Sequence, residues 1–312
     1  MKTSFVFTLL GDDSFKVDGA KRVNINDASD FQYTFWNPTD DIGRKHIYAT
    51  RHRFTDEALD MLYISLMVFC VDRSVNREKQ EDAWTRDLEL YIPVKAFDKW
   101  EQCKPTLTKM LNFLTGDHWT LHFRRRVALT DDEYMYIKGR NRYRNSIKRI
   151  DSDIFCMLSG GLDSFIGAIN LLKEGKNPIF VSHYGGGKGV KLYQDKVVNS
   201  LKNKYNVDPT RFYRFYAASQ NGIEDSTRSR SLMFFAHAIA IASGIGHHVN
   251  LLIPENGVIS LNIPLTVMRF GSLSTRCLAP TLTKEDGQEK PLGTVENVFH
   301  VQSEGQQSKR LV

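Results

Sequence analysis

From residue 152 onward, short apolar runs alternate with longer segments whose apolar residues have helical spacing. The runs predict strands at Ile154–Leu158, Pro178–Tyr184, Arg211–Tyr216 and Val249–Pro254. The longer segments predict helices at Asp163–Lys173 (closed by Gly175), Leu192–Tyr205 and Arg228–Ser243. This alternation is typical of an α/β fold with a parallel sheet and right-handed crossovers. Ligands of such sheets lie beyond the carboxyl ends of the strands.

The preceding part of the chain mixes strand-like and helix-like patterns. Strands are expected at Ser4–Leu10, Phe31–Trp36, His46–Phe54, Asp87–Val94 and Trp119–Phe123. Helices are expected from an N-cap at Thr55 through Val71, with its apolar residues on one broad face, and over Pro105–Leu114. We therefore expect an α+β N-terminal domain at 1–137, a basic linker at 138–151, the α/β domain at 152–276 and a flexible polar tail at 277–312. Within that tail, Val295–Val301 is the candidate strand.

Composition narrows the class of protein only slightly. Hydrophobic residues make up 41% and charged residues 25% of the 312 residues, which is typical of a folded protein. The net charge of +6 fits an anionic partner such as ATP, RNA or an acidic protein. The four cysteines lie far apart, so we expect neither disulfides nor a zinc site, and a cytoplasmic location fits. The longest apolar stretch, Leu232–Ile245, is shorter than the ~20 residues of a membrane span, so no membrane contact is expected.

The most informative segment is Ser-Gly-Gly-Leu-Asp-Ser, between the first strand and the first helix of the α/β part. Its residues are Ser159, Gly160, Gly161, Leu162, Asp163 and Ser164. The glycines let backbone N–H groups approach an anion, and the positive end of the following helix points to the same place. The segment therefore predicts a phosphate site, in which Asp163 either holds Mg²⁺ or caps the helix.

Polar residues near other expected strand ends and helix starts are further candidates. They are His183 and Tyr184, Lys188 just beyond them, Arg228 and Arg230 at the start of a helix, and Glu255 after the fourth strand. Two arginines at a helix start are unfavourable for the helix dipole unless an anion lies there. We therefore expect an anion beside Arg228 and Arg230.

Ser159–Ser164 and its strand–loop–helix context resemble the PP-loop of the ATP pyrophosphatase superfamily, which has an adenine nucleotide alpha hydrolase-like fold. The resemblance implies cleavage of ATP between the α and β phosphates, with Mg²⁺ and without zinc. It also implies catalytic roles for Asp163, Lys188 and Arg230. The implied nucleotide-binding residues are Ser159–Ser164, His183, Tyr184, Arg228 and Glu255.

Within that superfamily, residues 152–276 are similar to the 7-cyano-7-deazaguanine synthase (QueC) family. The similarity includes Tyr184-Gly185-Gly186 and Thr227-Arg228-Ser229-Arg230. QueC proper has a zinc-binding cysteine cluster where this chain has only Cys277, and it lacks a comparable N-terminal domain. In both respects the chain resembles QueC-like proteins of antiphage systems, such as QatC and the type IV CBASS member. This implies an ATP-dependent carbon–nitrogen ligase that joins a deazapurine carboxylate to an amine on a protein partner from the same defence operon.

Two alternatives stay open. A PP-loop enzyme that modifies tRNA or amidates a small molecule is supported by the basic stretch Lys138–Arg149, with its interleaved tyrosines. The same stretch is also typical of a solvated linker. The other alternative is a module that binds ATP without turnover.

Overall fold

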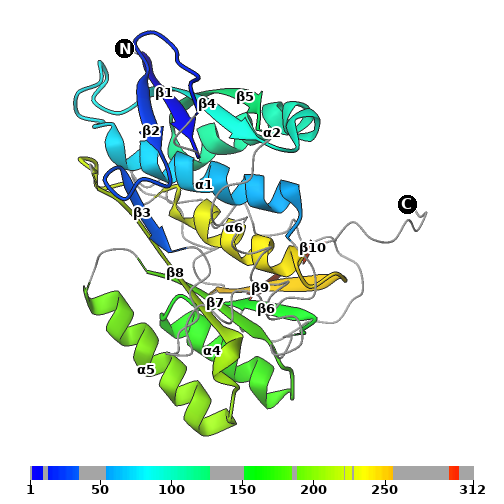
Figure 1. Ribbon diagram of the computed structural model, residues 1–312. Coiled ribbons are helices and arrows are strands. Elements are labelled where there is room, and N and C mark those ends of the chain that lie inside the picture. The colour runs from blue at the N-terminus through cyan, green and yellow to red at the C-terminus, as the bar shows by residue number, and fades with distance from the viewer. Residues whose placement is uncertain are drawn as a thin grey trace, which may run out of the picture.

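The computed structural model in Figure 1 describes residues 2–9, 13–34, 54–126, 151–184, 188–220, 222–226, 228–255 and 295–301. Residues 46–53 of the strand expected at His46–Phe54, and residues 138–150 of the basic linker expected at 138–151, lie outside these ranges. Within them, no helix is long and apolar enough to cross a membrane.

The first sheet is formed by the N-terminal part of the chain. It has four strands in the order β2-β1-β4-β5. These are β1 (Lys2–Thr8), β2 (Lys21–Asn24), β4 (Asp87–Val94) and β5 (His118–Arg125). Every neighbouring pair runs parallel. An α+β domain is built mainly of antiparallel strands, so the described part of residues 1–137 is corrected to α/β.

Two helices accompany this sheet, α1 (Asp56–Ser74) and α2 (Phe97–Thr115). Thr55 caps α1 as expected, since its side chain accepts a hydrogen bond from the Ala58 N–H at 3.2 Å. However, α1 is buried on almost every side, because it packs between the first sheet and helix α6 (Arg230–Ser243). The prediction for α2 was wrong at its start, because Pro105 lies inside the helix.

The second sheet has six strands in the order β10-β9-β6-β7-β8-β3. Their bounds are β3 (Phe31–Thr34), β6 (Ile154–Met157), β7 (Ile179–Tyr184), β8 (Phe212–Ser219), β9 (Val249–Glu255) and β10 (Val295–Val301). The four central strands are parallel, and the edge strands β3 and β10 are antiparallel to their neighbours. The sheet therefore takes one strand from residues 1–137 and one from the polar tail, where β10 has the bounds of the candidate strand expected there.

The central strands reverse their order beside β6. The chain runs from β6 outward to β7 and β8, and then returns to the other side of β6 as β9. Helices α4 (Leu162–Lys173) and α5 (Lys188–Tyr205) cover one face, while α6 covers the other (Figure 1). This arrangement is compatible with a doubly wound, Rossmann-like fold. In such folds ligands bind outside the carboxyl ends of the strands at the reversal, which here lies between β6 and β9.

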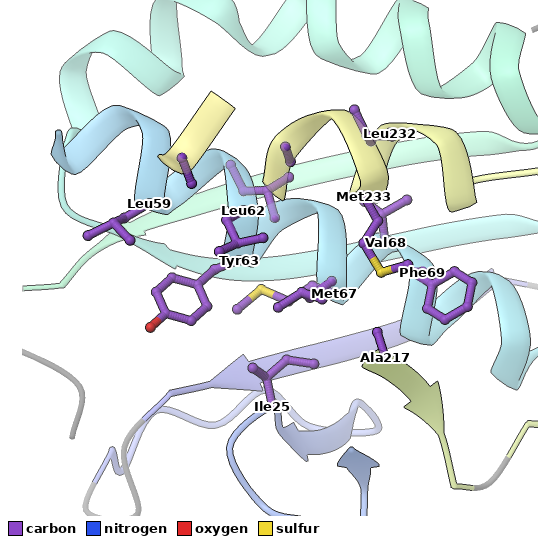
Figure 2. Close-up of a cluster of buried hydrophobic side chains, with 14 of the residues drawn as sticks. Ile25, Leu59, Leu62, Tyr63, Met67, Val68, Phe69, Ala217, Leu232 and Met233 are labelled. Carbon is purple, nitrogen blue, oxygen red and sulfur yellow. The ribbon is translucent and has the colours of Figure 1, made fainter. Parts of the chain in front are cut away.

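One hydrophobic core joins the two sheets. It includes Leu62 and Met67 of α1, Met233 of α6 and Ala217 of β8, all close to fully buried (Figure 2). Each large apolar side chain in such a core contributes about 1.5–3 kcal/mol. The N-terminal part is therefore packed onto the second sheet and is not a separately packed unit.

Candidate functional site

The Ser159–Ser164 loop begins where β6 ends, at the strand-order reversal. Gly160 has φ +90°, a conformation that side chains other than glycine rarely adopt. Gly161 then takes the extended N-cap conformation, and α4 begins at Leu162, one residue earlier than predicted. The two glycines thus turn the chain from a buried strand into a helix within a few residues.

The two serine hydroxyls of the loop bond within the loop itself. Ser164 Oγ donates to the Gly161 carbonyl oxygen at 2.9 Å, and Ser159 Oγ donates to Ser164 Oγ at 3.1 Å. Ser159 Oγ also accepts from the Gly161 N–H at 3.3 Å. The serines therefore hold the shape of the loop, a role that the sequence pattern did not indicate.

The first turn of α4 supplies the donors of the site. The first backbone hydrogen bond of the helix runs from the Phe165 N–H to the Gly161 carbonyl oxygen at 3.1 Å, so the N–H groups of residues 162–164 have no partner within the helix. No side chain among the described residues caps this turn. Such a helix end attracts an anion, and phosphate is the usual one.

Asp163 lies in the same turn and is partly exposed. Its carboxylate has no hydrogen bond or ion pair within the described ranges. It is therefore not the helix cap, and it is open to a cation. The part of the chain that the structure describes has no cluster of three acidic, histidine or cysteine ligands. Mg²⁺ that arrives with a phosphate needs only one or two carboxylates, so Asp163 fits that ion.

Sequence reasoning missed Gln194, which reaches the loop from α5. Its Nε2 donates to the Ser159 carbonyl oxygen at 3.1 Å and to the His183 carbonyl oxygen at 2.9 Å. A methyl group at Gly160 would lie 2.7 Å from Gln194 Cγ, so the two residues are in close contact. A signal was present: Gln194 is polar, yet it lies four and seven residues before the buried Val198 and Leu201.

His183 and Arg230 come together at the end of β7. Burial, with smaller contributions from the nearby His237 and Arg230, lowers the pKa of His183 to about 3. The His183 ring centroid lies 6.5 Å from that of His237 in α6. Arg230 is exposed in the first turn of α6, so it adds a positive charge on the side of His183.

Tyr184 belongs to a patch of cations and aromatic rings across β7, β8 and α5. Its ring centroid is 5.1 Å from that of Tyr216 and 5.8 Å from both Arg214 Cζ and Lys191 Nζ. Arg214 is buried and pairs with Asp195 at 2.6 Å. Asp195 neutralises Arg214, whereas the exposed Lys191 offers its positive charge to a ligand beside the Tyr184 ring.

Arg228 does not join these residues through any contact that the described ranges contain. Its guanidinium lies 4.5 Å over the ring of Trp84 and donates to the Thr115 carbonyl oxygen at 2.7 Å. Both partners belong to the N-terminal part of the chain. Lys188 is the first residue of α5 and Glu255 the last of β9, and their side chains lie outside the description.

The anion expected at the start of α6 is a carboxylate of the protein itself. Asp72 Oδ2 accepts hydrogen bonds from Ser226 Oγ and from both the N–H and the hydroxyl of Ser229. Asp72 Oδ1 pairs with the fully buried Arg86 at 2.7 Å. The helix dipole is therefore already compensated at this end.

Comparisons of the chain with protein-family models, with curated proteins and with solved structures gave no match in any of the three. The function must therefore be argued from the Ser159–Ser164 loop and its surroundings.

Proposed function

We propose that the protein is an ATP-dependent ligase of the QueC-like PP-loop type. It binds Mg²⁺-ATP at the Ser159–Ser164 loop, transfers AMP to a carboxylate with release of pyrophosphate, and joins the resulting acyl group to an amine. The observation that carries this proposal is the position of the loop: it opens onto the free N–H groups of α4 beside the β6–β9 reversal.

The role of each group at the site follows from its charge: N–H groups and Arg230 act on the phosphates, and Asp163 acts on the metal ion. A carboxylate oxygen of the substrate attacks the α-phosphorus, and pyrophosphate leaves with the electron pair of the broken P–O bond. The N–H groups of Leu162, Asp163 and Ser164 bind the leaving phosphates, because they point at the charge that develops there. The Asp163 carboxylate orients the metal ion, and Arg230 adds positive charge at the same edge.

The second half of the reaction consumes the acyl adenylate. The lone pair of the amine attacks the acyl carbon, AMP departs with the electrons of the acyl–oxygen bond, and the amine proton passes to solvent. The aromatic and cationic patch at Tyr184 and Tyr216 supports a flat acid as substrate. A deazapurine carboxylate has this chemistry, and the acceptor amine belongs to a protein partner from the same defence operon.

The test is AMP formation from ATP labelled at the α-phosphate, with Mg²⁺, 7-carboxy-7-deazaguanine and hydroxylamine as a general amine. Wild type should release AMP and pyrophosphate only when the acid is present. Asp163→Asn should lower that rate at least about tenfold, since it removes the ligand charge. Ser200→Ala, a hydroxyl change on the exposed side of α5, is the matched control and should keep full activity.

Two outcomes would replace this proposal by an alternative. AMP release that requires added tRNA and ignores the acid would select the RNA-modifying enzyme. Tight ATP binding without AMP release, with acid, amine and co-expressed neighbouring proteins all present, would select the non-catalytic ATP-binding module.

A further inference from the structure

Gln194 is a buried amide that touches three separate segments. Its side chain is 1% exposed, and its two N–H bonds go to the loop after β6 and to the end of β7. Its own backbone belongs to α5. A single primary amide therefore ties together the loop, the strand and the helix.

We infer that Gln194 is the positioning residue of the Ser159–Ser164 loop, an inference that rests on the proposed function of that loop. In a trans peptide unit the C=O and the following N–H point in opposite directions. Because Gln194 holds the Ser159 carbonyl toward α5, the Gly160 N–H must point away from α5. Gln194 thereby aims a backbone donor of the loop without touching the ligand.

The close contact at Gly160 supports the same role. The backbone and side chain of Gln194 lie so near Gly160 that an added methyl group would meet Gln194 Cγ at 2.7 Å and its backbone nitrogen at 3.4 Å. The loop is thus both in close contact with Gln194 and hydrogen-bonded to it. This leaves the turn between Ser159 and Gly161 little freedom to rotate.

The second bond of the amide fixes a distance between two parts of the site. It reaches the carbonyl oxygen of His183, the residue before Tyr184. The loop and the aromatic patch at Tyr184 are therefore held in one frame. Among uncharged side chains, only Asn and Gln donate two hydrogen bonds from one nitrogen, and Asn is one methylene shorter.

The amide oxygen of Gln194, Oε1, indicates that the residue does more than fill space. Gln194 Oε1 is buried and accepts no hydrogen bond from the residues that the structure describes. A buried acceptor without a donor costs about 1–3 kcal/mol. An apolar side chain of similar length would fill the same space without that cost, so the two N–H bonds are the feature that distinguishes this residue.

The experiment measures the binding of inorganic pyrophosphate with Mg²⁺, and of adenosine, by titration calorimetry. Gln194→Met keeps the side-chain length and removes both donors. We expect its pyrophosphate affinity to fall about tenfold or more, while its adenosine affinity stays within about twofold of wild type. Asn199→Met makes the same amide-to-thioether change at an exposed position of α5 and should bind both probes like wild type.

Equal pyrophosphate binding by wild type and Gln194→Met would overturn the role of Gln194 and leave the proposed function standing. Absence of pyrophosphate and ATP binding by wild type would overturn both. If Gln194→Met fails to fold, Gln194→Glu replaces it, because a protonated carboxyl regains one donor. Its affinity deficit relative to wild type should then shrink between pH 8 and pH 5.5, and a constant deficit would contradict the inference.

Discussion

The carboxylate of Asp72, in the last turn of α1, accepts hydrogen bonds from the Ser229 N–H at 3.2 Å and from the Ser229 hydroxyl at 2.7 Å, where α6 begins. A residue of the N-terminal part therefore anchors Ser229, the N-cap residue of the helix that carries Arg230. Burial favours a raised pKa for Asp72, but Arg86 and the Ser229 bonds outweigh it and hold the pKa below its usual value. The group that holds Ser229 is thus a charged carboxylate.

Removing this carboxylate should destabilise the whole protein. Asp72→Asn leaves the buried Arg86 with one fewer counter-charge, and breaking a buried ion pair of this kind costs about 3–5 kcal/mol. Asp225→Asn is the matched control, because Asp225 pairs with Arg73 at the exposed surface, where such a pair contributes at most about 1 kcal/mol. The free energy of unfolding in urea measures both. Similar losses of unfolding free energy in the two variants would show that the buried Asp72 carboxylate contributes no more to stability than a surface ion pair.

Replacing Arg228 or Arg230 by alanine should have different effects, one on stability and the other on AMP formation. Arg228→Ala loses the Trp84 ring and the Thr115 carbonyl, so we expect a loss of about 1–3 kcal/mol in stability and unchanged ATP affinity. Arg230→Ala, at an exposed position beside His183, should leave stability nearly unchanged and slow AMP formation at least about tenfold. Urea unfolding and the AMP assay on the same preparations check this, and a reversed pattern would contradict the assignment.

Acid should weaken the fold through two buried histidines. Burial lowers the pKa of His183 to about 3 and that of His237 to about 4, from an ordinary value of 6.5. Below pH 6.5 these two histidines bind protons in the unfolded chain but stay neutral in the folded protein. The free energy of unfolding should therefore fall as the pH drops from about 6.5 toward 4, by at most about 1.4 kcal/mol per pH unit for each histidine.

The pH dependence of wild type alone does not isolate the histidines, because Asp60 changes the free energy of unfolding in the opposite direction. A variant that lacks one histidine is therefore needed. Burial raises the pKa of Asp60 to about 6, so its protonation stabilises the folded state as the pH falls. That contribution cancels in the difference between wild type and His237→Gln. Urea unfolding between pH 7.5 and pH 5 should give His237→Gln the shallower loss of stability, and equal slopes would show that His237 does not titrate as described.

Two glycines within helices should respond to alanine with opposite signs. A methyl group at Gly167 of α4 would lie 2.5 Å from Pro254 Cβ in β9, so Gly167→Ala should cost about 1–3 kcal/mol through overpacking. Gly189 of α5 has open space around it, so Gly189→Ala should gain up to about 1 kcal/mol. Thermal unfolding compares the pair. A tolerated Gly167→Ala would mean that α4 and β9 can separate at little cost.

Much of the fold follows from local pattern. The bounds of β4 and β10 agree with the sequence prediction, because each is a run of strand-forming residues between clear breaks. β2 was missed, since Val23 is its one buried residue and no alternation marks it. It forms by pairing with β1, where Val23 lies opposite Phe7. The start of α2 was missed because a proline usually marks the first turn of a helix, whereas Pro105 lies in the middle.

The candidate site shows the same limit. The Ser159–Ser164 loop is visible in the sequence because its glycines and serines act on their immediate neighbours. Gln194 bonds to the loop across 35 residues of chain, and Asp72 bonds to Ser229 across 157. Such partners depend on tertiary packing, so the sequence pattern alone could not show that Arg228 contacts Trp84 and Thr115, or that Asp72 supplies an anion at the start of α6.

The antiparallel pairing of β3 with β8 also sets an order on biosynthesis. Phe31 leaves the ribosome 188 residues (219 − 31) before its partner Ser219. At about 5–20 residues per second, β3 waits roughly ten to forty seconds for its neighbour. A nascent chain in this interval carries an unpaired strand that invites wrong pairing with other chains. The second sheet therefore gains its β3 edge only once β8 has emerged, long after β3 itself was made.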